Sequence, residues 1–286
     1  MKPVRSYLAV DIGGTKLSCG IVTTEGEVLA RDRCATPADG VWDALAALVS
    51  GVQSSAEHAQ LIACGVGSGG PMSDDGNKVS TLSIPTWRDF PLRSQLAALT
   101  GLETFVDNDA KAVVLGETWC GAAVGCRDVI GMVVSTGVGG GIITDGTLLD
   151  GNTGNAGHIG HITVAPNGRL CKCGSRGCLE AVASGTAIAE MTGRPPADAP
   201  LSIIEQTGAY VGRAVASVAT LLDLRLAVIG GSVALGFGAP FYRAAQAEAD
   251  RYANISFVRG VAIRPTGLGA DAPLVGAAAV ARRYVK

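Results

Sequence analysis

Asp109 is the residue whose type and position point most directly to chemistry. It lies in the run Asp107-Asn108-Asp109-Ala110-Lys111, at the junction of an expected strand and an expected helix. A carboxylate there can accept the proton of a sugar hydroxyl that attacks a γ-phosphate, while the adjacent asparagine orients the sugar. Aspartate and asparagine are also favoured helix N-caps. Spacing alone therefore supports a catalytic base and a helix cap equally.

Two glycine-rich turns are candidates for binding phosphate. One is the run Asp11–Lys16 and the other is the run Ser135–Gly141. Glycines let backbone N–H groups approach phosphate oxygens, and threonine adds a hydroxyl donor. An ordinary hairpin turn is the alternative for either run alone, but two such turns in matching contexts favour a nucleotide. The candidate residues are Asp11, Gly13, Gly14, Thr15, Lys16, Thr136, Gly137, Gly139 and Gly140.

Asp11 has a further role in this hypothesis, because it ends a strand directly before the first glycines. A carboxylate in that position can hold Mg²⁺, directly or through water. The chain contains no Gly-x-x-x-x-Gly-Lys-Ser/Thr motif, so a Walker A loop is excluded.

Three of the eight cysteines cluster near a histidine. Cys171, Cys173 and Cys178 follow His161, whereas the other five cysteines are scattered singly. Three thiolates and one imidazole form a closed tetrahedral zinc site with no open position for catalysis. We therefore predict a structural zinc in a loop over residues 161–178, with chance clustering of reduced thiols as the alternative.

The segment Gly157-His158-Ile159-Gly160-His161 is a candidate for sugar binding, together with Glu180. If zinc holds one ring nitrogen of His161, the other is left to hydrogen-bond a hydroxyl group. His58 lies on an expected helix and is interpreted as a surface residue.

The elements that position these residues repeat one pattern. Strand, glycine turn and strand occur near residues 8–31 and again near residues 129–149, where Ser135–Gly141 is the expected turn and Ile142–Asp145 the second strand. A helix is expected over Trp42–Ala59, and an alanine-rich helix over Pro273–Tyr284 that returns to the first half. Two related halves that face each other across a cleft are the predicted architecture.

Composition limits the classes of function. The chain has 286 residues, a net charge of −2 and no block of Lys or Arg, so we expect no nucleic-acid partner. The apolar runs are too short to span a bilayer and Met1–Tyr7 lacks the core of a signal peptide, so we expect no membrane partner and a cytoplasmic location.

The order of the motifs resembles the ROK sugar kinases. The matching runs are Asp-Ile-Gly-Gly-Thr-Lys, Asn-Asp-Ala, Gly-Val-Gly-Gly-Gly, Gly-x-x-Gly-His and Cys-x-Cys-Gly-x-x-Gly-Cys-x-Glu, and they extend from Asp11 to the terminal helix. The resemblance implies an α/β actin-like, RNase H-like fold of two domains, with ATP and sugar in the cleft. It implies domains at 1–108 with 273–286, and at 109–272.

The resemblance also implies roles for individual residues. Asp109 is the expected base, and Gly70, Thr81, Asn108, His158, His161 and Glu180 are the expected sugar contacts. Ile229-Gly230-Gly231-Ser232 resembles the family's turn on the adenosine side, so Gly230 and Gly231 join the nucleotide-binding residues. The implied cofactors are structural zinc and Mg²⁺ with ATP, and the implied assembly is a homodimer or tetramer.

One position departs from most of the family. Where most members, glucokinases included, have Ala-Gly-Glu-x-Gly-His, this chain has Ala-Gly-His-Ile-Gly-His, with His158 in place of the glutamate. This segment resembles N-acetylmannosamine kinases of the family. Neutral histidine offers one donor and one acceptor, which suits an acetamido group better than a carboxylate does. The expected activity is C6 phosphorylation of N-acetylmannosamine, with glucose as the alternative substrate and a non-catalytic sugar sensor as the alternative class.

Overall fold

The computed structural model describes residues 3–285; residues 1–2 and 286, which the expected domain ranges include, lie outside it. Internal contacts divide the chain into two units. The first contains the described residues up to Gly121, the segment Asp150–Ala156 and the described residues from Leu268 onward. The second contains Ala122–Leu149 and Gly157–Gly267. The chain therefore passes between the units four times.

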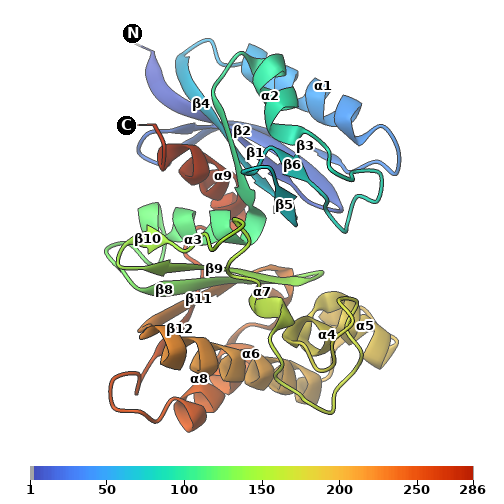
Figure 1. The fold of residues 1–286 in the computed structure, drawn as a ribbon, viewed down its shortest axis with the longest axis vertical. Coiled ribbons are helices and arrows are strands. Elements are labelled where there is room, and N and C mark those ends of the chain that lie inside the picture. The colour runs from blue at the N-terminus through green and yellow to red at the C-terminus, as the bar shows by residue number, and fades with distance from the viewer. Residues whose placement is uncertain (1–2, 286) are drawn as a thin grey trace. The chain divides into compact units, whose positions relative to one another are not determined.

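The first unit is built on a five-stranded sheet in the order β3-β2-β1-β4-β7 (Figure 1). Strands β1, β2 and β3 are antiparallel, whereas β4 and β7 run parallel to β1. The strands are β1 (Val4–Ile12), β2 (Lys16–Thr23), β3 (Val28–Ala35), β4 (Ala59–Ser68) and β7 (Thr104–Asn108). A small hairpin, β5 (Met72–Ser73) with β6 (Lys78–Val79), follows β4.

Helices cover both faces of this sheet. Leu8 and Val10 of β1 pack towards α1 (Val41–Ser54) and α2 (Leu92–Thr100). Tyr7 and Ala9 point to the other face, against α9 (Ala272–Arg282). Burial on both faces explains why the first strand is an unbroken apolar run in the sequence. The expected helix over residues 42–59 ends earlier, at Ser54, because the chain from Ala59 pairs with β1 as strand β4.

Helix α3 (Asp109–Cys120) packs against α9 and β4 and therefore groups with the first unit, although the sequence-based boundary was placed at residues 108/109. The contact between α9 and β4 is close. A Cβ atom on Gly65 would lie 2.0 Å from the carbonyl oxygen of Ala277. Glycine in the strand and alanine in the helix are thus the residues that allow the two backbones to approach.

The second unit repeats this arrangement with the strand order β10-β9-β8-β11-β12. Its strands are β8 (Val129–Val134), β9 (Val138–Thr144), β10 (Thr147–Leu148), β11 (Leu226–Gly230) and β12 (Ala262–Pro265). Strands β8, β9 and β10 are antiparallel, and β11 and β12 run parallel to β8. The expected duplication of strand, glycine turn and strand is therefore present in the fold.

The expected start of the second strand, Ile142, was wrong. Strand β9 begins at Val138, because Gly139, Gly140 and Gly141 pair with β8 as regular strand residues. The turn is thereby shortened to Ser135–Gly137.

Helices complete the second unit. They are η1 (Ile159–His161), α4 (Leu179–Ala183), α5 (Gly185–Thr192), η2 (Pro196–Asp198), α6 (Leu201–Leu222), α7 (Ser232–Phe237) and α8 (Ala239–Tyr252), while η3 (Gly269–Asp271) lies in the first unit. The core joins Ile130, Met132 and Ile229 of the sheet to Val211 of α6 and Phe241 of α8.

Candidate functional site

The carboxyl ends of three neighbouring strands bring acidic residues together in the first unit. Strands β1, β4 and β7 are parallel, with Asp11 in register with Gly67, and Gly67 in register with Asp107. A Cβ atom on Gly67 would lie 3.5 Å from the Cα of Asp109 and 3.8 Å from Oδ1 of Asp11. Ligands of open α/β sheets bind at this edge. The structure thus places Asp11 and Asp109 at one end of the sheet.

Asn108 provides the helix cap and Asp109 is the first residue of α3. The side-chain oxygen of Asn108 accepts hydrogen bonds from the backbone N–H groups of Ala110, at 3.0 Å, and Lys111, at 3.4 Å. Oδ1 of Asp109 accepts a bond of 2.9 Å from the N–H of Ala110. A helix N-terminus favours an ionised carboxylate. The side-chain cap of α3 is therefore provided by Asn108.

Electrostatics at this sheet edge disfavour a second negative charge. Burial first, and the nearby charge of Asp109 second, raise the pKa of Asp11 to about 7, while Lys16 opposes the shift. A cation at this position would favour the ionised form of Asp11.

The first glycine turn follows the end of β1 at Ile12. The N–H of Gly13 donates to the carbonyl of Lys16 at 3.0 Å, and the hydroxyl of Thr36 donates to the carbonyl of Gly13 at 2.7 Å. A Cβ atom on Gly14 would lie 2.5 Å from Cβ of Ser83. Gly14, Thr15 and Lys16 are exposed, so this turn presents its backbone to the solvent.

Gly70 and Thr81 lie on the same side of the first unit but differ in access. A Cβ atom on Gly70 would lie 3.8 Å from Nδ2 of Asn108, so these two expected sugar contacts are neighbours. Thr81 is only 2% exposed, and its hydroxyl lies 3.0 Å from that of Ser83. The same hydroxyl lies below Gly69, whose Cβ would be 2.8 Å away. Thr81 therefore supports the turn that carries Gly70.

In the second unit, the turn at Ser135–Gly137 lies beside the turn at Gly230–Gly231. The hydroxyl groups of Ser135 and Ser232 are 2.9 Å apart. Gly231 has φ of 96°, and a Cβ atom there would lie 2.3 Å from the carbonyl oxygen of Val134. Only glycine fits this close approach. Two segments expected to contact the nucleotide are thus brought together, with Thr136 exposed at the tip.

Glu180 contacts this turn, which the sequence did not reveal. Oε2 of Glu180 accepts a hydrogen bond of 3.0 Å from the N–H of Val138. The same oxygen lies 2.8 Å from the position of a Cβ on Gly137. The start of α5 also holds the turn, because the N–H of Gly185 donates to the carbonyl of Ser135 at 2.7 Å. Glu180 therefore joins the segment after Cys178 to the second glycine turn.

The predicted zinc ligands converge in the second unit. One ligand atom each of His161, Cys171, Cys173 and Cys178 lies within 4.8 Å of all the others. Nδ1 of His161 is 3.7 Å from Sγ of Cys171, and Sγ of Cys173 is 3.7 Å from Sγ of Cys178. Tetrahedral zinc with bonds of about 2.0–2.3 Å requires ligand–ligand separations of roughly 3.5–3.8 Å. The cluster has the donor types and spacing of a closed zinc site.

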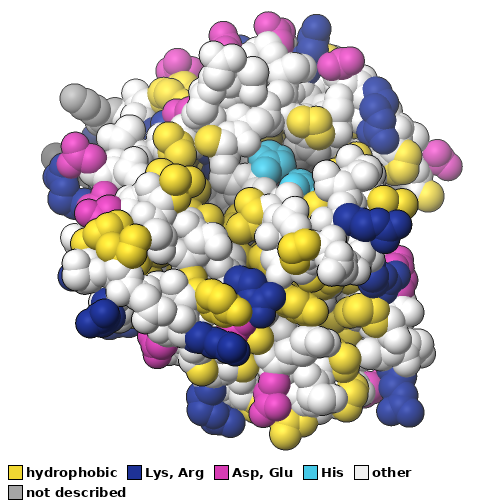
Figure 2. Space-filling view, turned by 60° about the horizontal axis from the view of Figure 1, so that its bottom comes forward, with side chains coloured by type: hydrophobic (Ala, Val, Ile, Leu, Met, Phe, Trp, Pro, Cys, Tyr) yellow, Lys and Arg dark blue, Asp and Glu magenta, His cyan; other side chains and the backbone are white. Residues whose placement is uncertain are grey.

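Nδ1 is the ring nitrogen of His161 that faces Cys171. His158 is exposed, with its ring centroid 6.3 Å from that of His161. Histidine side chains are visible on the face drawn in Figure 2, where Lys and Arg side chains are interspersed with Asp and Glu.

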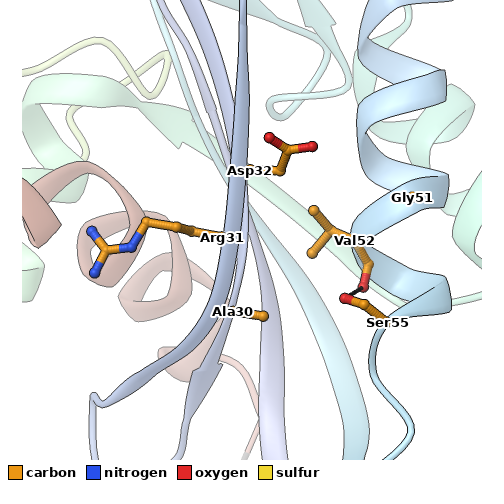
Figure 3. Close-up of a pocket in the computed structure, with 6 residues that line it drawn as sticks. All are labelled: Ala30, Arg31, Asp32, Gly51, Val52 and Ser55. Atoms are coloured by element: carbon orange, nitrogen blue, oxygen red, sulfur yellow. Dashed lines mark hydrogen bonds between the residues drawn. The ribbon is translucent and has the colours of Figure 1, made fainter.

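A hollow of about 220 Å³ lies elsewhere, between β3 and α1 (Figure 3). It is lined by Ala30, Arg31, Asp32, Gly51, Val52 and Ser55. Arg31 lies on the opposite side of β3 from Val52 and pairs with Asp271 at 2.5 Å. The expected site residues do not line this hollow.

Sequence reasoning missed a buried charged cluster next to Asp109. Lys111, Asp107, Asp150 and Arg283 form ion pairs, although they come from three distant segments of the chain. The one signal in the sequence was a lysine two residues after Asp109 in a helix that is otherwise largely buried. Within residues 3–285, the structure has no helix long and apolar enough to cross a membrane.

Comparison with known proteins identifies the family. Residues 7–284 match the model of the ROK family. A glucokinase of Halalkalibacterium halodurans is 34% identical, with 95% of this chain and 93% of the relative covered. An N-acetylmannosamine kinase of Citrobacter koseri is 35% identical, with 82% and 85% covered. The chain belongs to the ROK family.

A solved structure supports the same assignment at the level of the fold. The ROK family glucokinase from Streptomyces griseus, in complex with glucose and AMPPNP, superimposes with a TM-score of 0.84 at 32% identity. The match covers 97% of this chain and 99% of that chain. The expected actin-like α/β fold is confirmed. The two kinds of kinase among the relatives have nearly equal identity, so similarity does not select a sugar.

Proposed function

We propose that this chain is an ATP-dependent sugar kinase that transfers the γ-phosphoryl group of Mg-ATP to the C6 hydroxyl of a hexose. The observation that carries the proposal is the position of Asp109, at the carboxyl end of β7 and beside Asp11. The curated relatives at 34–35% identity are named as sugar kinases of two specificities, which supports the reaction class.

In the proposed reaction, Asp109 accepts the proton of the C6 hydroxyl as the sugar oxygen bonds to the γ-phosphorus. The bond from that phosphorus to the bridging oxygen breaks, and ADP leaves with the electron pair. Backbone N–H groups of the glycine turns offset the charge on the phosphates. The residues proposed for the nucleotide are Asp11, Gly13, Gly14, Thr15, Lys16, Thr136, Gly137, Gly139, Gly140, Gly230 and Gly231, with Asp11 on the side of Mg²⁺.

The residues proposed to contact the sugar are Gly70, Thr81, Asn108, Asp109, His158, His161 and Glu180. Zinc, held by His161, Cys171, Cys173 and Cys178, would supply a fixed fold for the loop and a fixed ring orientation for His161. His161 Nε2 then donates to or accepts from a sugar hydroxyl.

We propose N-acetylmannosamine as the substrate, on the basis of His158. The exposed imidazole offers a donor and an acceptor to the acetamido group, where a glutamate would offer acceptors alone. Glucose is the alternative substrate.

The test is ADP release by the purified protein with Mg-ATP and each of four sugars: N-acetylmannosamine, glucose, N-acetylglucosamine and mannose. The highest kcat/KM is expected with N-acetylmannosamine. The highest value with glucose would support the alternative substrate and leave the kinase assignment intact. Turnover with none of the sugars would overturn the kinase assignment and favour a sugar sensor, against which the presence of Asp109 argues.

The role of His158 has a test of its own. His158→Glu is expected to lower the ratio of kcat/KM for N-acetylmannosamine to that for glucose by about tenfold, since one polar contact of this kind corresponds to about 1–1.5 kcal/mol. His58→Glu, at the other histidine position outside the site, is the matched control. An unchanged ratio would show that His158 does not select the sugar. The homodimer or tetramer and the cytoplasmic location stay predictions.

A further inference from the structure

The segment Asp150–Ala156, which we call the anchoring loop, belongs to the first unit by its contacts. It is entered from β10 and left towards His158. The N–H of Ala156 donates to the carbonyl of Asp150 at 3.0 Å, so the loop closes on itself. Its two ends are thereby held together, and its remaining polar groups are available to bind the rest of the unit.

One end of the anchoring loop is held by Lys111, whose side chain is only 1% exposed. Nζ of Lys111 lies 3.0 Å from each of three oxygens: Oδ1 of Asp150, the carbonyl of Gly154 and Oδ1 of Asp107. An ammonium group has three donors, so all three are used. A buried lysine in the first turn of α3 thus connects this helix to the loop.

Arg283 completes the cluster from the end of the chain. It lies 2.9 Å from Oδ2 of Asp150 and 3.3 Å from Oδ2 of Asp107. Two carboxylates and two cations therefore alternate. The side chain of Asp150 is 45% exposed and can be solvated without its partners, whereas that of Asp107 is 10% exposed. Asp107 consequently depends on its two cations, Lys111 and Arg283, because an unpaired buried charge is strongly destabilising.

Asp107 and Lys111 lie on both sides of the residues that the proposed reaction uses. Oδ1 of Asp107 accepts a bond of 2.8 Å from the N–H of Asn108. Lys111 donates its own N–H to the cap oxygen of Asn108. The ion pair between residues 107 and 111 therefore spans Asn108 and Asp109.

The other end of the anchoring loop holds the turn that carries Gly70. Oδ1 of Asn155 accepts a bond of 3.2 Å from the N–H of Met72, and Nδ2 of Asn155 donates to the carbonyl of Met72 at 3.1 Å. Asn155 thus pairs with one backbone residue as a neighbouring strand would. Met72 follows Gly70 by two residues, and Gly70 lies beside Asn108.

We propose that the anchoring loop is the positioning element of the sugar site in the first unit, with Lys111 fixing Asn108 and Asp109 and Asn155 fixing the Gly70 turn. Lys111 and Asn155 are positioning residues, because they act on the sugar through Asp109, Asn108 and Gly70. The inference rests on the proposed function for its effect on turnover. Its effect on the backbone is independent of that function.

The experiment compares full-length Lys111→Met, Asn155→Ala and the double variant Lys111→Met/Asp107→Asn with the unchanged protein. Lys111→Met is expected to lower kcat by about 10- to 100-fold, since a small displacement of a reacting group has effects of that size. Its dissociation constant for the sugar is expected to change by less than about threefold, which corresponds to less than one hydrogen bond. The double variant is expected to regain at least part of kcat, because it no longer contains a buried carboxylate that has lost one of its two cations.

Asn155→Ala is expected to raise KM for the sugar by about tenfold with a smaller change in kcat, because it releases the Gly70 turn and leaves Asp109 in place. Arg127→Met is the matched control, since Arg127 pairs with Asp145 at an exposed position. Kinetic constants of Lys111→Met and Asn155→Ala that equal those of the unchanged protein would overturn the proposal. Equal losses of kcat in the single and double variants at position 111 would also overturn it.

Amide hydrogen exchange separates this proposal from the proposed function. Asn155→Ala is expected to speed exchange at Met72, and Lys111→Met at Asn108, whether or not any sugar is phosphorylated. Exchange at both amides that matches the unchanged protein would contradict the positioning role. If the unchanged protein turns over no sugar but the variants exchange faster at these amides, the positioning role of the loop is retained and the kinase assignment is rejected.

Discussion

Two carboxylates at one sheet edge explain why Asp109, and not Asp11, is the proposed base. Asp109 begins α3, where the helix N-terminus favours its charge, and its Oδ1 accepts the N–H of Ala110. Asp11 is the last residue but one of β1, and burial is the main cause that raises its pKa to about 7. Asp11 is therefore expected to become charged most easily when a cation is present.

Replacement of Asp109 tests the assignment of the base. Asp109→Asn is expected to lower kcat by about 10²–10⁴, which is the usual contribution of a general base. Its affinity for the sugar is expected to stay within a few-fold, because the amide oxygen still accepts a hydrogen bond. Steady-state ADP release and calorimetric titration with the sugar measure the two effects, and Asp43→Asn in α1 is the control. Turnover close to that of the unchanged protein would falsify the assignment.

The raised pKa of Asp11 predicts a pH dependence of stability. Between about pH 4 and pH 7 the folded state keeps a proton on Asp11 that the unfolded chain has lost, so stability falls as pH rises through this window. The free energy of unfolding is expected to lose about 2 kcal/mol from this group between pH 5.5 and pH 8.

Asp11→Asn is expected to remove this loss. The free energy of unfolding of the variant minus that of the unchanged protein should therefore be higher at pH 8 than at pH 5.5. Urea unfolding at the two pH values, with zinc present and without Mg²⁺ or nucleotide, measures the difference. The prediction would be contradicted if the variant and the unchanged protein differ in free energy of unfolding by the same amount at both pH values.

At the scale of elements, the loop that holds the cysteines is directly connected to the second glycine turn. Helix α4 begins after Cys178, and its Glu180 accepts the N–H of Val138 at the start of β9. On the other side, η1 carries His161 and packs on the same residue, since a Cβ on Gly160 would lie 2.1 Å from the carbonyl of Val138. Gly160 and Glu180, which flank the loop 161–178, therefore both contact Val138.

Loss of this connection is expected to weaken nucleotide binding. Glu180→Ala should raise the dissociation constant of Mg-ADP by about tenfold, since a hydrogen bond to a charged group contributes about 1.5 kcal/mol. Glu180→Gln retains an acceptor and should have a smaller effect. Zinc removal by a chelator should raise the same constant.

Calorimetric titration with Mg-ADP measures this dissociation constant. Sugar is left out, so that an effect of the substitution on sugar binding does not contribute. Glu190→Ala, which breaks the exposed pair with Arg169, is the matched control. If Glu180→Ala and Glu180→Gln both bind Mg-ADP with the affinity of the unchanged protein, the role of Glu180 is rejected.

At the scale of the whole molecule, the first unit depends on three separate parts of the chain. The face of its sheet formed by Tyr7, Ala9 and Ala63 is covered by α9, which follows the entire second unit in sequence. The anchoring loop comes from the middle of the chain. Four crossings between units make independent folding of the N-terminal part unfavourable, because its core is incomplete without α9.

A fragment of residues 1–121 is therefore expected to lack a cooperative unfolding transition. The same fragment joined by a Gly/Ser linker to residues 268–286 should regain one, because nine residues of α9 are buried in the full chain. Circular dichroism during thermal unfolding compares both with the full chain. Cooperative unfolding of residues 1–121 alone near the melting temperature of the full chain would contradict this account.

Local patterns predicted most of the elements. Apolar runs indicated β1 and β8, and the repeated strand, glycine turn and strand indicated two related halves. Predictions failed where strand pairing outweighed local preference. Glycine is unfavourable within strands, yet Gly139–Gly141 belong to β9, because each pairs with β8 and because the close approach of Gly157 to Gly140 leaves no space for a Cβ.

The sequence by itself determined the residue types and their order: the carboxylate after a strand, the paired glycine turns, and three cysteines after a histidine. These follow from local chemistry, because each motif lies within about twenty consecutive residues. Only the tertiary structure decided that Thr81 is buried, that Glu180 holds Val138, and that Lys111 joins Asp150 and Arg283. The physical reason is that ion pairs and hydrogen bonds between distant segments depend on how strands order and helices pack, which no local pattern specifies.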